Sequence, residues 1–194
     1  MAENTEKKDR RVMYTKMFLR ESLLELMKEK PIDKITPTEL CRTANINRNT
    51  FYSHYYSPRD VLIEIENDFS AQIIESLSNL SATEDVSISH ILREICNIIY
   101  TQQEFCKILL SDNGDAAFFE KMISMGKPVV LEGWRTGGVQ LNDNEMEMFF
   151  AFIVNGSIAL IQKWVAADMQ ELPSEVAKLI ERAAYGGING MMSE

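Results

Sequence analysis

Apolar residues recur mostly at three- and four-residue spacing along the chain, which is the period of an amphipathic α-helix. The alternation of apolar and polar residues that indicates strands is scarce. The pattern therefore predicts an all-helical protein of about nine helices. A length of 194 residues suits one helical unit with a long core, or two small domains that share a helix.

Residues typical of helix caps predict where several helices begin or end. Thr36, Pro37 and Glu39 have the residue types of an N-cap, a first helical position and a capping box. Pro58, between a serine and an acidic turn, predicts the start of a long helix. Glycine pairs are expected to break the chain at 137–138 and to end the last helix near 186–187. The other helices are expected at residues 14–28, 48–54, 88–99, 105–110, 116–125, 129–134 and 143–167, with the last one opening near 173.

Two short helices near the N-terminus have the layout of a helix-turn-helix. Asn45 tolerates the left-handed backbone of a tight turn, and Asn47 is a good cap for the second helix. Ile46 and Phe51 are predicted to anchor that helix from behind. Arginine and asparagine pair with base edges, and hydroxyl groups suit phosphate oxygens, although any helical hairpin can present a polar face. The side chains expected to face outward are Arg48, Asn49, Thr50, Tyr52, Ser53 and His54.

Charge is distributed unevenly along the chain. The net charge is -9, yet residues 1–60 contain 12 lysines and arginines against 9 acidic residues. Residues 61–194 contain 8 against 20. Only the N-terminal part has a balance suited to nucleic-acid phosphates, and the acidic remainder is expected to face away from them.

The segment ITPTELCRTANINRNTFYSHY, residues 35–55, resembles the helix-turn-helix of the TetR family of transcription regulators. The run TFYSHY is its most specific part. The positions that match in order and spacing are Thr36, Leu40, Ala44, Ile46, Thr50, Phe51, Tyr52 and His54. The chain departs from the family at Asn45 and Asn49, which replace glycines, and at Pro58, which replaces a phosphate-binding lysine.

The polar first eleven residues, the short apolar stretch at residues 148–161 and the unpaired cysteines predict a cytoplasmic protein without a membrane span. The resemblance implies a homodimer without cofactor that binds palindromic double-stranded operator DNA. It further implies a repressor whose DNA-binding domain, residues 1–56 with a flexible arm at 1–12, precedes a helical ligand-binding and dimerisation domain at 57–194. An unidentified small molecule would be the effector. The expected DNA-binding residues are Thr36, Thr38, Arg48, Asn49, Thr50, Tyr52, Ser53, His54 and Arg59, the last in place of the missing lysine.

The later part of the chain, including residues 105–110 and 152–164, resembles regulators of dihydroxyacetone kinase operons, some of which are activators that work with a partner protein. Effector contacts are expected in the middle helices, which usually line the ligand pocket in this family. Packing in the hydrophobic core explains the same residues equally well. The candidates are Phe118, Phe119, Met122 and Trp134.

Apolar residues of the last two long helices occupy wider stripes than one core needs, which predicts a four-helix interface between two copies. Filling of the monomer core is the alternative. The predicted dimerisation residues are Phe149, Phe152, Ile153, Gly156, Leu160, Trp164, Leu179, Ile180 and Ala183.

Signatures of enzymes and metal sites are missing from the sequence. The two histidines are far apart, phosphate-binding glycine motifs do not occur, and the three cysteines form no CxxC pair. We therefore expect no catalytic residue and no metal ligand. Two hypotheses remain: a ligand-responsive DNA-binding regulator, and a co-regulator or activator that acts mainly through a protein partner.

Overall fold

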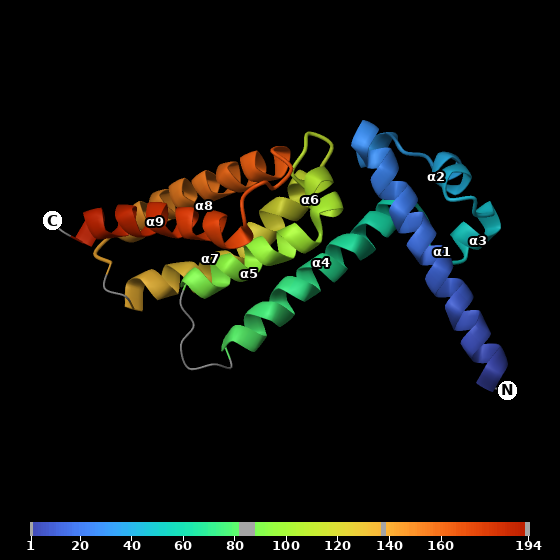
Figure 1. Cartoon of the computed structure of the whole chain (residues 1–194), viewed down its shortest axis with the longest axis horizontal. Helices are drawn as coiled ribbons and strands as arrows, with labels where there is room; N and C mark the ends of the chain where they lie inside the picture. Colours follow the sequence, from blue (N-terminus) through green and yellow to red (C-terminus); the bar gives the residue numbers. More distant parts are fainter. Residues whose placement is uncertain (1, 82–87, 137–138, 193–194) are drawn as a thin grey trace. The chain divides into compact units, whose positions relative to one another are not determined.

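The computed structural model describes residues 2–81, 88–136 and 139–192, and these residues form nine α-helices, one short 3-10 helix and no strand (Figure 1). The expected all-helical fold is confirmed. The elements are α1 (Ala2–Glu29), η1 (Ile32–Lys34), α2 (Pro37–Thr43), α3 (Arg48–Tyr52), α4 (Pro58–Ser81), α5 (Ile88–Thr101), α6 (Gln103–Leu109), α7 (Ala116–Thr136), α8 (Asp143–Ala166) and α9 (Pro173–Met192).

The chain divides into two compact units. The first comprises Met1–Phe69 with Ile108–Asp115, and the second comprises Ser70–Lys107 with Ala116–Glu194. The domain boundary expected after residue 56 falls inside the first unit. The reason is that the first half of α4 belongs there and buries Val61 and Leu62, which are at most 2% exposed.

The first unit has its core on α1. Leu19, Leu23 and Met27 are at most 1% exposed, and Leu40 of α2 is fully buried. Helix α1 begins at Ala2, so the segment expected as an N-terminal arm is helical. Its alanine, glutamate, lysine and arginine residues have high helix propensity, and no glycine or proline interrupts them.

The segment after α6 returns to the first unit and makes a tight turn at Gly114. The Gly114 amide donates to the Ser111 carbonyl oxygen at 3.0 Å, and a Cβ at Gly114 would lie 2.0 Å from the Leu109 carbonyl oxygen. Asn113 Nδ2 donates to the carbonyl oxygen of Lys28 at the end of α1, at 3.3 Å. Glycine is therefore required where this turn meets its own helix.

Gly114→Ala is expected to lower the free energy of unfolding by about 1–3 kcal/mol, because the added methyl group forces the turn away from α6. Chemical denaturation measures the change. Gly126→Ala is the matched control: a Cβ there meets nothing within 4 Å, so this helical substitution should not destabilise the protein. Equal loss in both variants would contradict the steric explanation.

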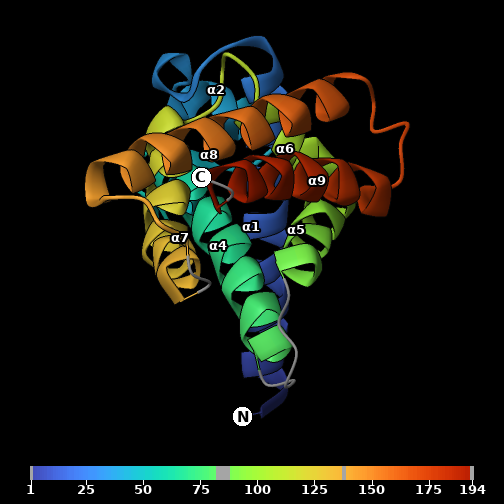
Figure 2. The same ribbon diagram turned by 90° about the vertical axis from the view of Figure 1, so that its left-hand side faces the viewer.

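The second unit contains the second half of α4, most of α6, and the helices α5, α7, α8 and α9. Helix α9 packs along α5 and against α8, and α8 packs against α7 (Figure 2). Gly187 of α9 makes a close approach possible, because a Cβ there would lie 3.0 Å from Phe149 Cζ. Tyr100 stacks on Trp164 with ring centroids 6.3 Å apart. One buried cluster contains Leu131, Trp134, Val139, Met146, Phe149 and Phe150.

Two helix boundaries expected in this unit are wrong. Helix α7 runs unbroken across residues 116–136 with Pro128 inside it, instead of forming two helices. The buried residues Phe118 and Leu131 hold the helix on both sides of the proline, so the missing amide donor does not end it. Helix α9 continues through Gly187 to Met192, because that glycine packs against α8. The expected break at residues 137–138 lies outside the described residues.

The three cysteines are free and buried. Burial raises the pKa of Cys96 to about 11 and that of Cys106 to about 12. Because the thiolate is the reactive form, iodoacetamide at pH 8 should leave the native chain unmodified and label all three cysteines after denaturation. Intact mass spectrometry measures both states. Rapid labelling of Cys96 or Cys106 in the native protein would contradict this expectation.

Candidate nucleic-acid interface

Helix α2 starts at the residues that the capping pattern indicated. Thr36 is the N-cap, and its Oγ1 accepts a hydrogen bond from the Glu39 amide at 3.2 Å. The reciprocal half of the expected capping box is replaced by an ion pair, since the Glu39 carboxylate accepts from Lys30 Nζ at 2.6 Å. This bond lowers the pKa of Glu39. Lys30 thus ties the end of α1 to α2.

The turn between α2 and α3 has the backbone that the sequence predicted. Asn45 has a φ of 53°, in the left-handed region that its conformational tolerance predicted. The Ile46 amide donates to the Cys41 carbonyl oxygen at 2.9 Å and closes the turn. Asn47 is the N-cap of α3, and its Oδ1 accepts from the Asn49 amide at 2.8 Å. The predicted cap and turn are both confirmed.

Helix α3 has one buried face. Phe51 is fully buried, and its ring lies 6.0 Å from the ring of the buried Tyr55. Ile46, the second expected anchor, is half-buried. The polar residues of α3 and the following turn lie on the opposite side. Arg48, Asn49, Thr50, Tyr52 and Ser53 are exposed, and His54 is half-buried.

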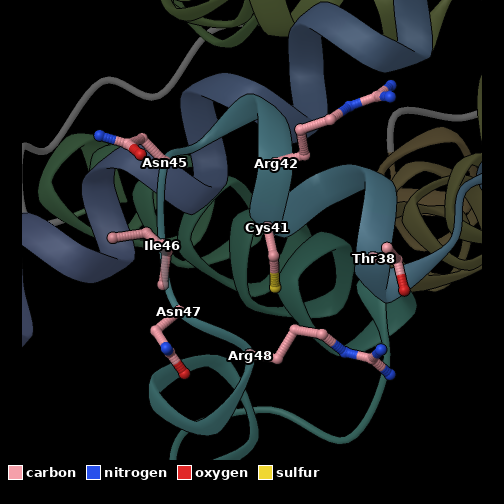
Figure 3. Close-up of a pocket in the computed structure, with 7 residues that line it drawn as sticks. All are labelled: Thr38, Cys41, Arg42, Asn45, Ile46, Asn47 and Arg48. Atoms are coloured by element: carbon pink, nitrogen blue, oxygen red, sulfur yellow. The ribbon is translucent and has the colours of Figure 1, made fainter.

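A surface hollow of about 550 Å³ lies between α2 and α3 (Figure 3). It is lined by Thr38, Cys41, Arg42, Asn45, Ile46, Asn47 and Arg48. In Figure 3 the side chain of Arg48 extends in the direction of Thr38, and these two expected DNA-binding residues from different helices line the same hollow. Arg42 points the other way. Sequence reasoning missed Arg42, although it lies four positions after Thr38 on the same face of α2.

Arg48 lies at the start of α3 with its charge available to a ligand. Its guanidinium carbon is 5.9 Å from the ring centroid of Tyr52, a cation–π arrangement that holds both side chains on the exposed face. Within the described part of the chain, no carboxylate forms an ion pair with Arg48 or with Arg42. The hollow therefore presents two guanidinium groups without an ion pair in the described residues, beside exposed amide and hydroxyl groups, and Arg42 lies near enough to Glu39 to help lower the pKa of that carboxyl group.

Arg59 does not have the environment expected of a phosphate ligand. Its Nη2 pairs with Asp33 of η1 at 2.8 Å, and its Nη1 pairs with Asp115 at 2.8 Å. Pro58, the residue before it, is buried. The expectation that Arg59 replaces the family lysine stays a prediction, and binding DNA would require its charge to be shared with or released from these two carboxylates of the first unit.

The residues expected to contact an effector are divided between core and partly exposed positions. Phe118 is 5% exposed, and Trp134 is 5% exposed with its ring 5.2 Å from that of Phe149. Met122 is half-buried, and its Sδ accepts from Ser70 Oγ at 3.3 Å. The side chain of Phe119 lies outside the described residues. Trp134 thus fills the core of the second unit, which was the alternative explanation for it.

Three of the residues expected in a dimer interface are instead buried inside the chain. Phe149, Trp164 and Ile180 are at most 7% exposed, and a side chain already buried has no surface left for a partner. Trp164 also donates from Nε1 to the Glu171 carbonyl oxygen at 3.0 Å. The remaining expected residues are exposed or half-buried; they are Phe152, Ile153, Gly156, Leu160, Leu179 and Ala183.

Comparison with known proteins relates the chain to transcriptional regulators. Residues 87–186 match a TetR-type family model described as the transcriptional regulator C-terminal region. An uncharacterized HTH-type transcriptional regulator of Bacillus subtilis, YxbF, is 33% identical over 81 residues. Those residues make up 41% of this chain and 21% of the relative, so the match spans about a fifth of that protein.

Solved structures share the fold across most of the chain. A TetR transcriptional regulator from Streptococcus agalactiae has a TM-score of 0.67 and 23% identity, covering 93% of this chain and 98% of its own. The regulator FadR from Bacillus subtilis, solved with stearoyl-CoA, has a TM-score of 0.64 and 13% identity, covering 89% and 98%. Such identities show the fold alone, and they do not establish the dihydroxyacetone kinase operon subgroup.

Proposed function

Because the chain belongs to the TetR family of transcriptional regulators, we propose that it binds palindromic double-stranded operator DNA as a homodimer and responds to a small effector. The family consists of transcriptional regulators, not enzymes. The single observation that carries the proposal is helix α3, which is anchored by the fully buried Phe51 and exposes Arg48 and its polar neighbours. We place the protein in the cytoplasm and assign it a repressor role.

In the proposed complex, α3 enters the major groove and α2 lies across its edge. Arg48 is the candidate for a guanine edge and Asn49 for an adenine edge, because these side chains form bidentate pairs with those bases. Thr36, Thr38, Thr50, Tyr52, Ser53 and His54 supply donors for the backbone or for bases. Arg42 joins this set as a cation on the same exposed surface.

Arg48→Ala is expected to weaken binding to the operator, the duplex that the parent protein selects from a randomised pool, by about 1–3 kcal/mol. It should also relax base preference at one position of each half-site. The fold should be unaffected, since Arg48 is exposed and has no ion pair in the described residues. Anisotropy titrations on the operator and on single-base variants measure both effects. Arg182→Ala, which removes an exposed charge from α9, is the control. Unchanged affinity and preference would remove Arg48 from base recognition.

A homodimer is proposed from the exposed apolar surface of α8 and α9. Phe152 is 71% exposed, Met148 is 66% exposed and Leu179 is 52% exposed. By length and composition α8 is apolar enough to cross a membrane, with only 22% of its apolar window buried. In a family of DNA-binding regulators, a second copy accounts for this surface. Two copies then place two α3 helices in successive major grooves of a palindromic site.

Effector control is proposed for the second unit. FadR from Bacillus subtilis shares its fold and was solved with stearoyl-CoA, so long-chain acyl-CoA is the first class to test. An effector acts by binding one arrangement of the dimer better than the other, which changes operator affinity by the same coupling free energy. Thermal unfolding with stearoyl-CoA and with free CoA tests this: a stabilisation by the acyl form alone, together with altered operator affinity, is expected.

The alternative function is a co-regulator or activator that acts mainly through a protein partner. The compensated charge of Arg59 and the acidic balance of residues 61–194 favour it, because both reduce attraction to phosphates. Selection of bound duplexes from a randomised pool, followed by titration at several salt concentrations, decides between the two. Enrichment of a palindrome supports direct operator recognition, whereas binding without sequence preference supports the alternative.

A further inference from the structure

Two adjacent tyrosines follow helix α3 and have opposite environments. Tyr55 is 4% exposed and packs in the core of the first unit, whereas Tyr56 is 90% exposed. Tyr56 is more exposed than any other large apolar or aromatic side chain in the described residues; the next is Phe152 at 71%. Packing therefore explains Tyr55 and leaves Tyr56 without a structural role.

The turn that carries Tyr56 is held by hydrogen bonds on both sides. The Tyr55 amide donates to the Phe51 carbonyl oxygen at 2.9 Å. Asp60 Oδ2 accepts from the amides of Tyr56 and Ser57 at 2.7 Å and 2.9 Å. The backbone thus directs Tyr56 away from the protein, and an aromatic side chain held outward on an ordered turn indicates a binding surface.

The first two residues of α4 present no unpaired charge beside this turn. Pro58 has no donor and is buried, and Arg59 is paired with Asp33 and Asp115. A tyrosine hydroxyl is a good donor to phosphate oxygens, and tyrosine is among the side chains that commonly bind the DNA backbone. Tyr56 lies only four positions beyond Tyr52, the last residue of α3.

We propose that Tyr56 binds a phosphate of the DNA backbone through its hydroxyl group, beside the groove that α3 enters. This inference rests on the proposed function, since it requires DNA at α3. The hydroxyl group is neutral, so the contact adds affinity without neutralising phosphate charge. Its contribution to affinity leaves the salt dependence of binding unchanged, because no phosphate charge is neutralised. It is also independent of the base sequence, because every nucleotide carries the same phosphate.

The test compares Tyr56→Phe and Tyr56→Lys with the parent protein. Anisotropy is measured on the duplex that the parent selects from a randomised pool and on an unrelated duplex, over a series of KCl concentrations. Tyr56→Phe should bind both duplexes about tenfold more weakly, with an unchanged slope of log affinity against log salt. Tyr56→Lys should recover affinity at low salt and steepen the slope by about one.

Tyr100→Phe is the matched control, because Tyr100 is 46% exposed on α5 in the second unit; it should bind like the parent. Melting temperatures of the Tyr56 variants should equal that of the parent. Parent-like affinity of Tyr56→Phe at every salt concentration overturns the inference, and so does a weaker affinity accompanied by a changed slope. A parent protein that binds no duplex removes the proposed function as well.

Discussion

Phe51→Ala is expected to lower the free energy of unfolding of the first unit by about 3–5 kcal/mol. The side chain is fully buried and lies behind the exposed residues of α3, so its removal leaves a cavity where α3 meets the core. Helix α3 has only five residues and cannot persist on its own local hydrogen bonds. The variant should therefore also lose operator binding, because Arg48 and its neighbours are no longer held in place.

Guanidinium denaturation followed by circular dichroism measures this loss. Tyr52→Ala is the comparison on the same helix, since Tyr52 is 45% exposed and its truncation removes less buried surface than that of the fully buried Phe51. Tyr52→Ala should weaken DNA binding while lowering the free energy of unfolding much less than Phe51→Ala does. A Phe51→Ala protein that unfolds like the parent yet fails to bind DNA would place Phe51 on the DNA-facing side and reverse the orientation of α3.

The helix-turn-helix was predictable because its chemistry is local. Thr36 and Asn47 bond amides two or three positions away, and Asn45 adopts the left-handed turn by its own conformational tolerance. Each of these features depends on a few consecutive residues, which the sequence displays directly. The same holds for the start of α8, where Asn142 and Glu145 form the complete capping box.

Contacts between distant residues were not predictable in the same way. Lys30 takes the Glu39 carboxylate, which the capping pattern assigned to the α2 N-terminus. Arg59 pairs with Asp33 and Asp115, which are 26 and 56 positions away in the chain. Nothing in the spacing of these residues indicates that they meet. The two ion pairs of Arg59 were not foreseen for that reason, and the exposed Tyr56 was overlooked beside it.

Glycine and proline residues in the second unit led to helix ends being predicted where the helices continue. Pro128 and Gly187 usually end helices, but here both lie within helices whose buried residues pack against neighbours. Similarly, an apolar residue in a wide stripe indicates burial without identifying the partner. Phe149 and Phe152 are three positions apart on α8, yet one is 7% exposed and the other 71%. Only the fold distinguishes core from surface here.

Gly156→Leu is expected to disrupt association and, through it, operator binding. Gly156 is exposed on α8, one turn beyond the exposed Phe152, and a Cβ there meets nothing within 4 Å of its own chain. The larger side chain therefore fits the isolated chain, and leucine even favours the helix. In a dimer whose α8 helices approach closely at this glycine, the leucine would separate them. A single half-site then has too few contacts for tight binding.

Sedimentation velocity at micromolar concentration, together with operator titrations, measures both effects. The parent is expected at twice the chain mass of 22.2 kDa, Gly156→Leu should shift towards the monomer, and operator affinity should fall by at least about tenfold. Gly126→Leu makes the same change at an exposed position of α7 that also has no neighbour within 4 Å, and it should behave like the parent. If the parent itself sediments at 22.2 kDa, the exposed surface of α8 and α9 does not join two copies and the two-groove arrangement is wrong.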